Sequence, residues 1–219
     1  MPLPKRILKV TFDVPPSSTP DGKPSSNLVL DESLELSVNI HKDCMQAQST
    51  CEINVVNLTT AMRDEFTQFT SWNKRMAQSG VNKNPAYIDV RVEAGYSDSG
   101  TVTVFTGQVV ESRLNSPQPN LGMTIRCASR QIDKLKDNAM PPAIGTFKEY
   151  VHWAADQMGV STVDCETSRD DVKIPNLLSA AHTVDSLLWT LQAAFRPFVV
   201  AYIDNGRLVL QEETETLRA

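Results

Sequence analysis

Three polar residues near the end of the chain come nearest to a catalytic set. His182, Asp185 and Ser186 provide the residue types of a base, an orienting carboxylate and a nucleophile. All three fall at the start of one short predicted helix, and so short a segment cannot aim three groups at one substrate. Asp185 and Ser186 instead suit the first helical turn after a cap at Thr183, where a carboxylate complements the helix dipole. This set predicts a helix N-terminus rather than a triad.

Paired carboxylates are the second possibility, since two acids that face each other across a sugar-sized cleft can hydrolyse a glycoside. Asp164 with Glu166 and Asp170 with Asp171 are candidates for such a pair. Because both pairs lie in loop-rich sequence, we interpret them as solvated residues.

Metal and phosphate chemistry find less support. His41, Cys44 and Cys51 could supply three zinc ligands, but a fourth would have to come from a distant part of the chain, and the tight Cys-x-x-Cys spacing is missing. The glycines follow no phosphate-loop spacing. The sequence therefore predicts no catalytic, cofactor-binding or metal-binding residue, and no enzyme.

The composition argues against nucleic acid and membrane as partners. The 219 residues include 21 Lys and Arg against 26 Asp and Glu, a net charge of −5, without a concentrated basic face. Lys5, Arg6 and Lys9 form the densest early basic group, which we interpret as protection of a strand edge. No apolar stretch reaches the length of a signal-sequence core or a membrane span, so we expect synthesis in the cytosol, where the four scattered cysteines stay reduced.

A strand that leads directly into a helix is the most informative element. Residues 51–58 alternate as a half-buried strand, and Thr59 or Thr60 is expected to cap a helix that runs to about Ser79, before Gly80. One stripe of this helix carries Met62, Phe66, Phe69, Trp72 and Met76. The stripe packs either on the chain's own sheet or, as a possible subunit interface, on a neighbouring copy.

Short alternating segments before and after this helix predict about seven antiparallel strands by Arg130. Strands of this kind, without further helices between them, indicate a barrel or sandwich. The fold class we predict is α+β, mainly antiparallel β-barrel or sandwich with the helix at about 59–80 inserted, over residues 1–130.

Residues 131–219 predict a small α+β domain of two helices and a hairpin. Thr146 and Glu149 have the spacing of a capping box at the start of a helix that Gly159 ends. A second helix starts at Thr183, and Asn205-Gly206 between two apolar runs predicts a hairpin.

The order of these elements carries a family resemblance. The strand that ends in Asn57-Leu58-Thr59 is followed by Ala94-Gly95-Tyr96 and then by Phe105-Thr106-Gly107. In this order the pattern resembles the baseplate hub proteins of contractile-tailed phages, whose first barrel is similar to the tail-tube fold and to the base of secretion-system spikes. The resemblance spans about Arg6 to Leu210.

The resemblance implies a structural virion protein of the tail baseplate, assembled in the host cytoplasm. Such a protein forms a homotrimer that joins the tail tube to the central spike and gives DNA a passage. Its expected partners are further copies of itself, the tail tube protein and a spike or tail-lysozyme protein, with the tape measure and baseplate wedge proteins as further candidates. Subunits of that family offer two barrels, whereas this chain predicts one barrel and an α+β domain.

Two other functions stay open from the sequence. The first is a cell-wall hydrolase carried on the baseplate, with its acids among Glu149, Asp164, Glu166 and Asp170. The second is a monomeric receptor-binding or carbohydrate-binding module that uses an exposed Trp72 or Trp153.

Overall fold

The computed structural model describes residues 4–16, 25–42, 48–67, 70, 87–115, 121–129, 144–162, 167–175, 183–194 and 199–212. The chain divides into two compact units. The first comprises Met1–His41 with Ser49–Ile132, and the second comprises Lys42–Gln48 with Asp133–Ala219.

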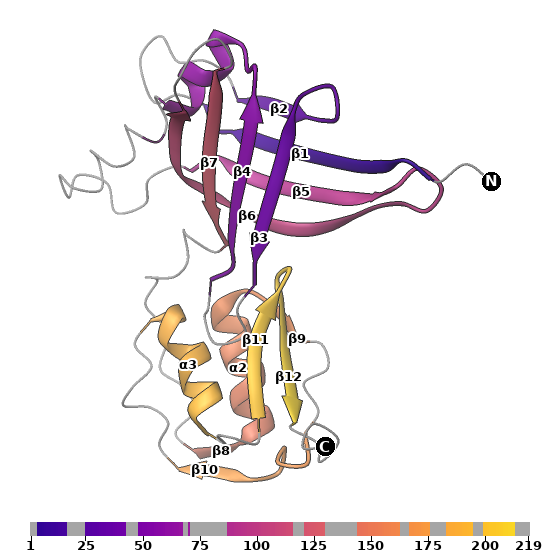
Figure 1. The fold of residues 1–219 in the computed structure, drawn as a ribbon. Helices are drawn as coiled ribbons and strands as arrows, with labels where there is room; N and C mark the ends of the chain where they lie inside the picture. The colour runs from indigo at the N-terminus through magenta and orange to yellow at the C-terminus, as the bar shows by residue number, and fades with distance from the viewer. Residues whose placement is uncertain are drawn as a thin grey trace, which may run out of the picture. The chain divides into compact units, whose positions relative to one another are not determined.

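The first unit is built on one antiparallel sheet of seven strands in the order β2-β1-β5-β6-β7-β4-β3 (Figure 1). The strands are β1 (Arg6–Val14), β2 (Ser26–Leu30), β3 (Leu36–His41), β4 (Thr50–Val56), β5 (Asp89–Tyr96), β6 (Gly100–Asn115) and β7 (Gly122–Ala128). The predicted α+β class with mainly antiparallel strands is confirmed. The sheet is open rather than a closed barrel, because β2 and β3 stand at its two ends without pairing to each other in the described residues.

Strand β6 turns the sheet through a corner. It pairs with β5 from Gly100 to Gln108 and with β7 from Gln108 to Asn115, and both ladders contain a register shift. Such irregularities bend a strand and increase its twist. Gly107 permits the bend, since a Cβ there would lie 2.7 Å from a backbone oxygen of β7. The two halves of the sheet therefore cross as two layers in Figure 1.

The core of this unit lies between the two layers. Its largest fully buried side chains include Phe12, Phe66, Phe105, Ile53 and Ile125. The four on strands occupy buried positions that alternate with more exposed ones on β1, β6, β4 and β7, as the period of a half-buried strand requires, and Phe66 comes from the helix after β4. Full burial of a side chain of this size contributes about 2–3 kcal/mol.

The strand-helix joint follows the sequence prediction. Val56 ends β4, Asn57 takes a positive φ of 65°, and the Thr59 hydroxyl accepts the Met62 N–H at 3.3 Å. A side-chain oxygen that accepts this N–H is the mark of an N-cap. The helix is described for residues 60–67 and 70, so its predicted end at Gly80 lies outside the described residues.

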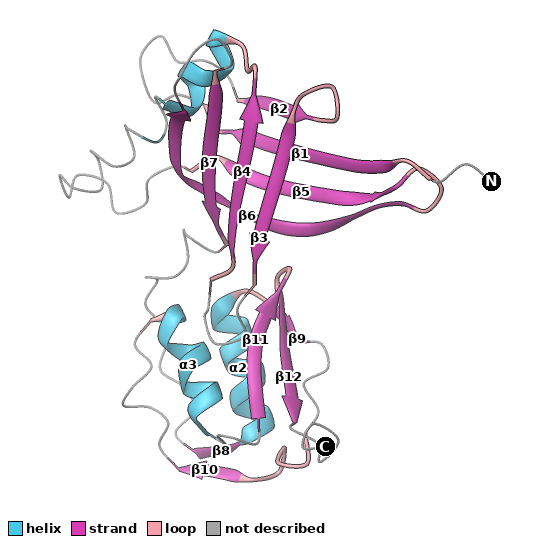
Figure 2. Ribbon diagram, in the orientation of Figure 1, coloured by secondary structure: helices cyan, strands magenta, loops and turns pink. Residues whose placement is uncertain are grey.

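In its described residues, the second unit combines two helices with a two-stranded and a three-stranded sheet (Figure 2). Its elements are β8 (Ile144–Thr146), α2 (Phe147–Met158), β9 (Ser161–Thr162), β10 (Lys173–Pro175), α3 (Val184–Ala194), β11 (Val199–Asp204) and β12 (Arg207–Glu212). Strand β10 pairs with β8, and the β11-β12 hairpin is extended by β9, parallel to β12. A separate core forms where α2, α3 and this hairpin meet around residues such as Phe147, Leu187, Leu191 and Leu208.

Three local predictions for this unit are confirmed. Thr146 and Glu149 form the reciprocal capping box of α2, and Gly159 caps its end in the left-handed region at φ 61°. Asn205 and Gly206 both have positive φ, 46° and 76°, at the turn between β11 and β12. Positive φ at both central residues is the conformation that makes Asn-Gly a hairpin signal.

Candidate assembly surface

Of the three residues considered for a triad, Ser186 forms hydrogen bonds in the first turn of α3, and the side chain of Asp185 lies outside the described part of the chain. The Ser186 hydroxyl donates to the Thr183 carbonyl at 2.7 Å and accepts the Thr183 N–H at 3.0 Å. His182 lies outside the described residues. The Ser186 hydroxyl therefore takes part in the hydrogen bonds at the start of the helix, as the sequence indicated.

The acids considered for hydrolysis also have local roles where the structure describes them. Glu149 accepts the Thr146 N–H at 3.0 Å within the capping box. Asp170 accepts the backbone N–H and the hydroxyl of Thr167 at 3.0 and 2.9 Å. The remaining acids of that hypothesis, Asp164 and Glu166, lie outside the described residues.

The described residues among the three considered for zinc differ in their exposure. His41 is exposed at the end of β3, whereas Cys51 is buried on β4 at 2 % exposure. Cys44 lies outside the described residues. Among the residues that the structure describes, no group of three or more His, Cys, Asp and Glu side chains could hold a metal ion.

The apolar stripe of the first helix begins in the core of its own unit. Phe66 is 1 % exposed and meets the ring of Phe12 edge-on at a centroid distance of 4.8 Å. Met62 is half-buried against the same core. This placement corresponds to the first of the two alternatives, packing on the chain's own sheet. Phe69, Trp72 and Met76 lie outside the described residues, so an interface through them stays a prediction.

A different apolar surface lies at the far end of the β5-β6 hairpin. Leu8 is the direct cross-strand partner of Ala94, and Ala94 is the partner of Val102. Direct partners point to the same face of a sheet, and here it is the face that carries the buried Val10 and Phe12. Val102 is nevertheless 67 % exposed. We call the row of Leu8, Ala94 and Val102 the hairpin ledge.

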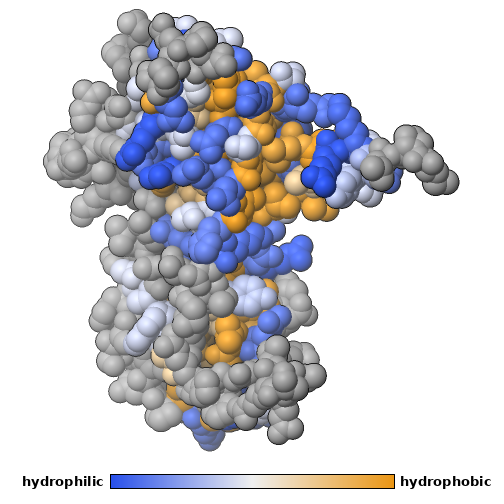
Figure 3. Space-filling model, in the orientation of Figure 1, coloured by the Kyte–Doolittle hydropathy of each residue, from blue (hydrophilic) through white to orange (hydrophobic). Residues whose placement is uncertain are grey.

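The free edge of β3 adds to this surface. Leu36, Val38 and Ile40 are half-buried and pack against the core that Leu8 also contacts. In Figure 1, β1, β5 and β6 run on past β3 toward the hairpin tip. Figure 3 shows hydrophobic surface in the region of β3 and the adjoining parts of β1 and β5. A strand edge without a partner in the described residues therefore borders apolar side chains of the opposite layer.

The outer face of the β7-β4 layer has the opposite character. Arg126 pairs with Glu52 at 3.1 Å and with Glu111 at 3.6 Å, and Glu111 also pairs with Arg113 at 2.7 Å. Glu52, Arg126 and Arg113 expose 41–63 % of their side chains and Glu111 exposes 22 %, so each pair remains open to solvent on at least one side and contributes about 0–1 kcal/mol. Such a face is satisfied by water and by its own charges, which distinguishes it from the hairpin ledge.

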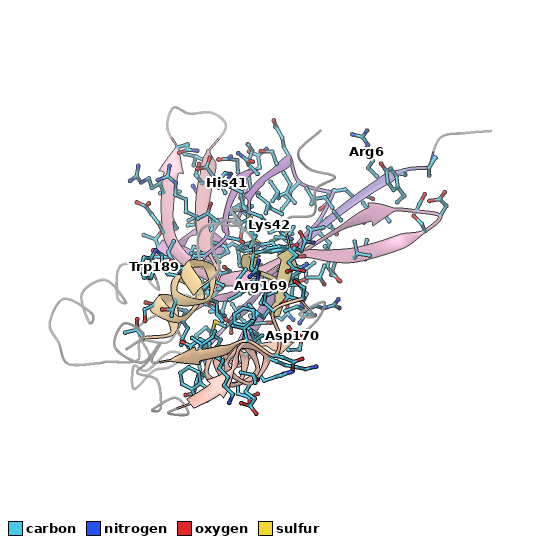
Figure 4. The ribbon with its side chains drawn as sticks, turned by 90° about the horizontal axis from the view of Figure 1, so that it is seen from below. Arg6, His41, Lys42, Arg169, Asp170 and Trp189 are labelled. Carbon is cyan, nitrogen blue, oxygen red and sulfur yellow. The ribbon has the colours of Figure 1, made fainter. Side chains whose placement is uncertain are left out.

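The second unit exposes one aromatic side chain that the sequence hypotheses did not select. Trp189 on α3 is 57 % exposed and lies on the outer side of the helix (Figure 4), while Leu187, Leu188 and Leu191 are buried. The helical spacing of these leucines could have indicated it, since position 189 falls on the opposite side. Trp153, considered for ligand binding as an exposed residue, is half-buried. Its ring lies tilted against the ring of Tyr150, with the two centroids 5.3 Å apart.

The described helices offer no membrane span, since none of them is long and apolar enough to cross a bilayer. No curated protein matches the sequence. A family model described as baseplate hub gp41, however, matches residues 7–219.

Two solved structures resemble this fold. The 43 kDa tail protein of prophage MuSo2 from Shewanella oneidensis has a TM-score of 0.51 at 11 % identity, over 94 % of this chain and 56 % of that one. The tail protein of Neisseria meningitidis MC58 has a TM-score of 0.48 at 12 % identity, over 93 % of this chain and 50 % of that one. At such identity the first likeness shows the fold alone. The chain spans about half the length of these two proteins.

Proposed function

This chain belongs to the baseplate hub gp41 family of phage tail proteins, and we propose that it acts there as an oligomeric subunit that joins the tail tube to the central spike. The role is mechanical: the subunits form a ring that continues the tube and leaves a passage for DNA. Membership in the family supports a structural role in the tail, and the surface of the first unit supports the oligomer.

The observation that carries the proposal is the hairpin ledge beside the free edge of β3. Val102 exposes 67 % of its surface, and Leu8 in the same cross-strand row is half-buried against the core. Exposed apolar side chains that continue a core indicate a surface buried by a partner. The unpaired backbone groups of an edge strand can bind another strand in the same contact.

The partner we propose for this surface is a second copy of the chain. Within the part of the chain that the structure describes, the sheet ends at two unpaired strands, β2 and β3, on opposite sides. A contact that joins one patch of a subunit to a different patch of the next is heterologous, and such contacts close into rings when the rotation fits. In this proposal the ring is the homotrimer that the family resemblance implies, with the tail tube protein above it and the spike or tail-lysozyme protein below.

The net negative charge suits a passage for DNA. The chain has a net charge of −5, and a negative wall does not hold a polyanion. In our proposal, another chain supplies the second barrel that hub subunits of this kind offer. The tape measure and baseplate wedge proteins are further neighbours to test.

The test compares two variants of adjacent residues on opposite faces of β6. Val102→Asp places a charge on the hairpin ledge, whereas Thr101→Asp places it on the other face, where Thr101 is exposed. The native mass is measured by light scattering behind a sizing column over a range of concentrations, and folding is checked by thermal melting. We expect the native chain and Thr101→Asp to assemble alike, and Val102→Asp to remain monomeric with the melting temperature that the native chain shows when it is diluted to the monomer.

Intact oligomers of Val102→Asp would refute the hairpin ledge as the contact. A native chain that stays monomeric at every concentration, and also in the presence of the tail tube protein, would refute the proposed oligomer itself.

A further inference from the structure

Two buried cysteines face each other across the strands β4 and β7. Cys51 and Cys127 are direct partners in the antiparallel ladder, are 2 % and 1 % exposed, and belong to the same core cluster. Both are free thiols in this structure. Their side chains therefore leave the sheet on one face at the same level.

The phase of the ladder sets the distance between the two backbones. Ser129 donates its N–H to the Ser49 carbonyl at 2.9 Å, two positions along the ladder from the cysteine pair. Since hydrogen-bonded pairs alternate, Cys51 and Cys127 form such a pair, with Cα atoms about 5.5 Å apart. Disulfides usually join Cα atoms about 4.4–6.8 Å apart.

We propose that Cys51 and Cys127 are an oxidation site, at which a peroxide converts the facing thiols into a reversible disulfide between β4 and β7. The inference does not depend on the proposed function. It concerns a change of environment: thiols stay reduced in a cytosol, whereas disulfides persist in oxidising surroundings.

The chemistry balances with hydrogen peroxide as the oxidant. The sulfur of Cys51 attacks one peroxide oxygen, the O–O bond breaks, and the departing hydroxide takes the thiol proton and leaves as water. The sulfur of Cys127 then attacks the resulting sulfenic acid, so that the S–S bond forms, the S–O bond breaks and a second water leaves with the Cys127 proton. One peroxide and two thiols give one disulfide and two waters.

Burial controls the order and the rate of these steps. It raises the pKa of Cys51 to about 12. Burial, and in second place the charge of Cys51, raises the pKa of Cys127 well above its ordinary value. Since the thiolate is the reactive form, Cys51 reacts first and the reaction is slow at neutral pH. The rate should rise about tenfold for each pH unit between 7 and 9, as the thiolate fraction does.

The disulfide would join two neighbouring strands of the sheet that are far apart in the sequence. It closes a loop from Cys51 to Cys127 that includes β5 and β6. A long closed loop restricts the unfolded chain, so we expect the oxidised protein to melt about 5 °C or more above the reduced one.

The test uses the full chain with Cys44 and Cys165 replaced by Ala, which leaves only the facing pair. A control carries Cys51→Ala and Cys127→Ala in the same background together with Asn54→Cys and Thr124→Cys, partners in the same two strands whose native side chains bond at 2.6 Å. Both proteins are treated with hydrogen peroxide, unfolded, alkylated and analysed by mass spectrometry. The control shows whether the treatment closes a pair of thiols at this ladder.

We expect the peptides of Cys51 and Cys127 to appear linked, with a mass lower by two hydrogens, and dithiothreitol to reverse the link. A rate that still rises about tenfold from pH 8 to 9 separates this reaction from closure after unfolding, because unfolded thiols, with a pKa of about 8.5, level off there. Full alkylation of both cysteines would overturn the proposal if it persists at pH 9 after a treatment about a thousandfold longer than the one that closes the control pair, which allows for the raised pKa of Cys51. Conversion to separate sulfinic acids without a linked peptide would overturn it as well.

Discussion

Removal of the Phe66 ring tests whether the first helix is anchored in its own unit. The ring is 1 % exposed, and its contact with Phe12 is edge-to-face at 4.8 Å with an interplanar angle of 76°. Phe66→Ala loses the transfer free energy of the ring and leaves a cavity, a change that costs about 3–5 kcal/mol. Against a domain stability of about 5–15 kcal/mol, this loss is large enough to measure without ambiguity.

The ring geometry also predicts how much of this stabilisation free energy comes from the contact with Phe12. An aromatic pair in this arrangement contributes about 0.5–1.5 kcal/mol beyond the area it buries. A double-mutant cycle of Phe66→Leu and Phe12→Leu should return a coupling free energy of this size, because each leucine keeps the site apolar and removes only the ring contact.

The assay is urea unfolding followed by circular dichroism, with Met62→Ala as the control from the same helix. Met62 is only half-buried, so its truncation should cost clearly less. The reasoning would be refuted if Phe66→Ala lost less than about 1 kcal/mol while the protein ceased to oligomerise. That result would assign the stripe to a subunit contact.

Three further predictions follow from single sites. Gly107→Ala should destabilise the first unit by about 1–3 kcal/mol, because its Cβ would lie 2.7 Å from a backbone oxygen of β7, whereas Gly122→Ala, with its nearest neighbour at 3.6 Å, should be close to neutral in the same urea titration. Tyr150→Phe should keep or raise the melting temperature, since the buried hydroxyl has no hydrogen-bond partner among the described residues; a loss of more than about 1 kcal/mol would show that the hydroxyl is bonded. Hydrogen bonds from the side chain and then the backbone of Ser168 lower the pKa of Glu212 below its usual 4.5, so this carboxylate stabilises the fold above that value and loses the effect as the pH falls through the lowered pKa. Ser168→Ala should therefore melt below the native chain at pH 7, with a gap that closes on acidification, and a gap independent of pH would contradict the assignment.

Local features were the most predictable from the sequence. The capping box of α2, the glycine at its end and the Asn-Gly turn each depend on residues within one turn of backbone, and the structure confirms all three. The start of the first helix at Thr59 is of the same kind. Such signals depend on dihedral preferences and short hydrogen bonds that neighbouring residues decide alone.

The pairing and order of the strands were harder to predict from the sequence. Strand β6 continues from Gly100 to Asn115 because its two halves pair with different partners, β5 and β7. The open edges at β2 and β3 depend on pairings between segments far apart in the chain. The hairpin ledge could not be predicted for the same reason, since Leu8 meets Ala94 only through such a pairing.

The strand order also sets a sequence of events for folding. The hairpins β1-β2 and β3-β4 are local and can form as soon as each is synthesised, yet in the finished sheet they stand at opposite ends. The meander β5-β6-β7, made later, must enter between them and pair with one strand of each. Until Ala128 leaves the ribosome, the two early hairpins therefore expose unpaired edges that invite association with other chains. The exposed edges of β1 and β4 are covered only when β5 and β7 have been synthesised and have paired with them.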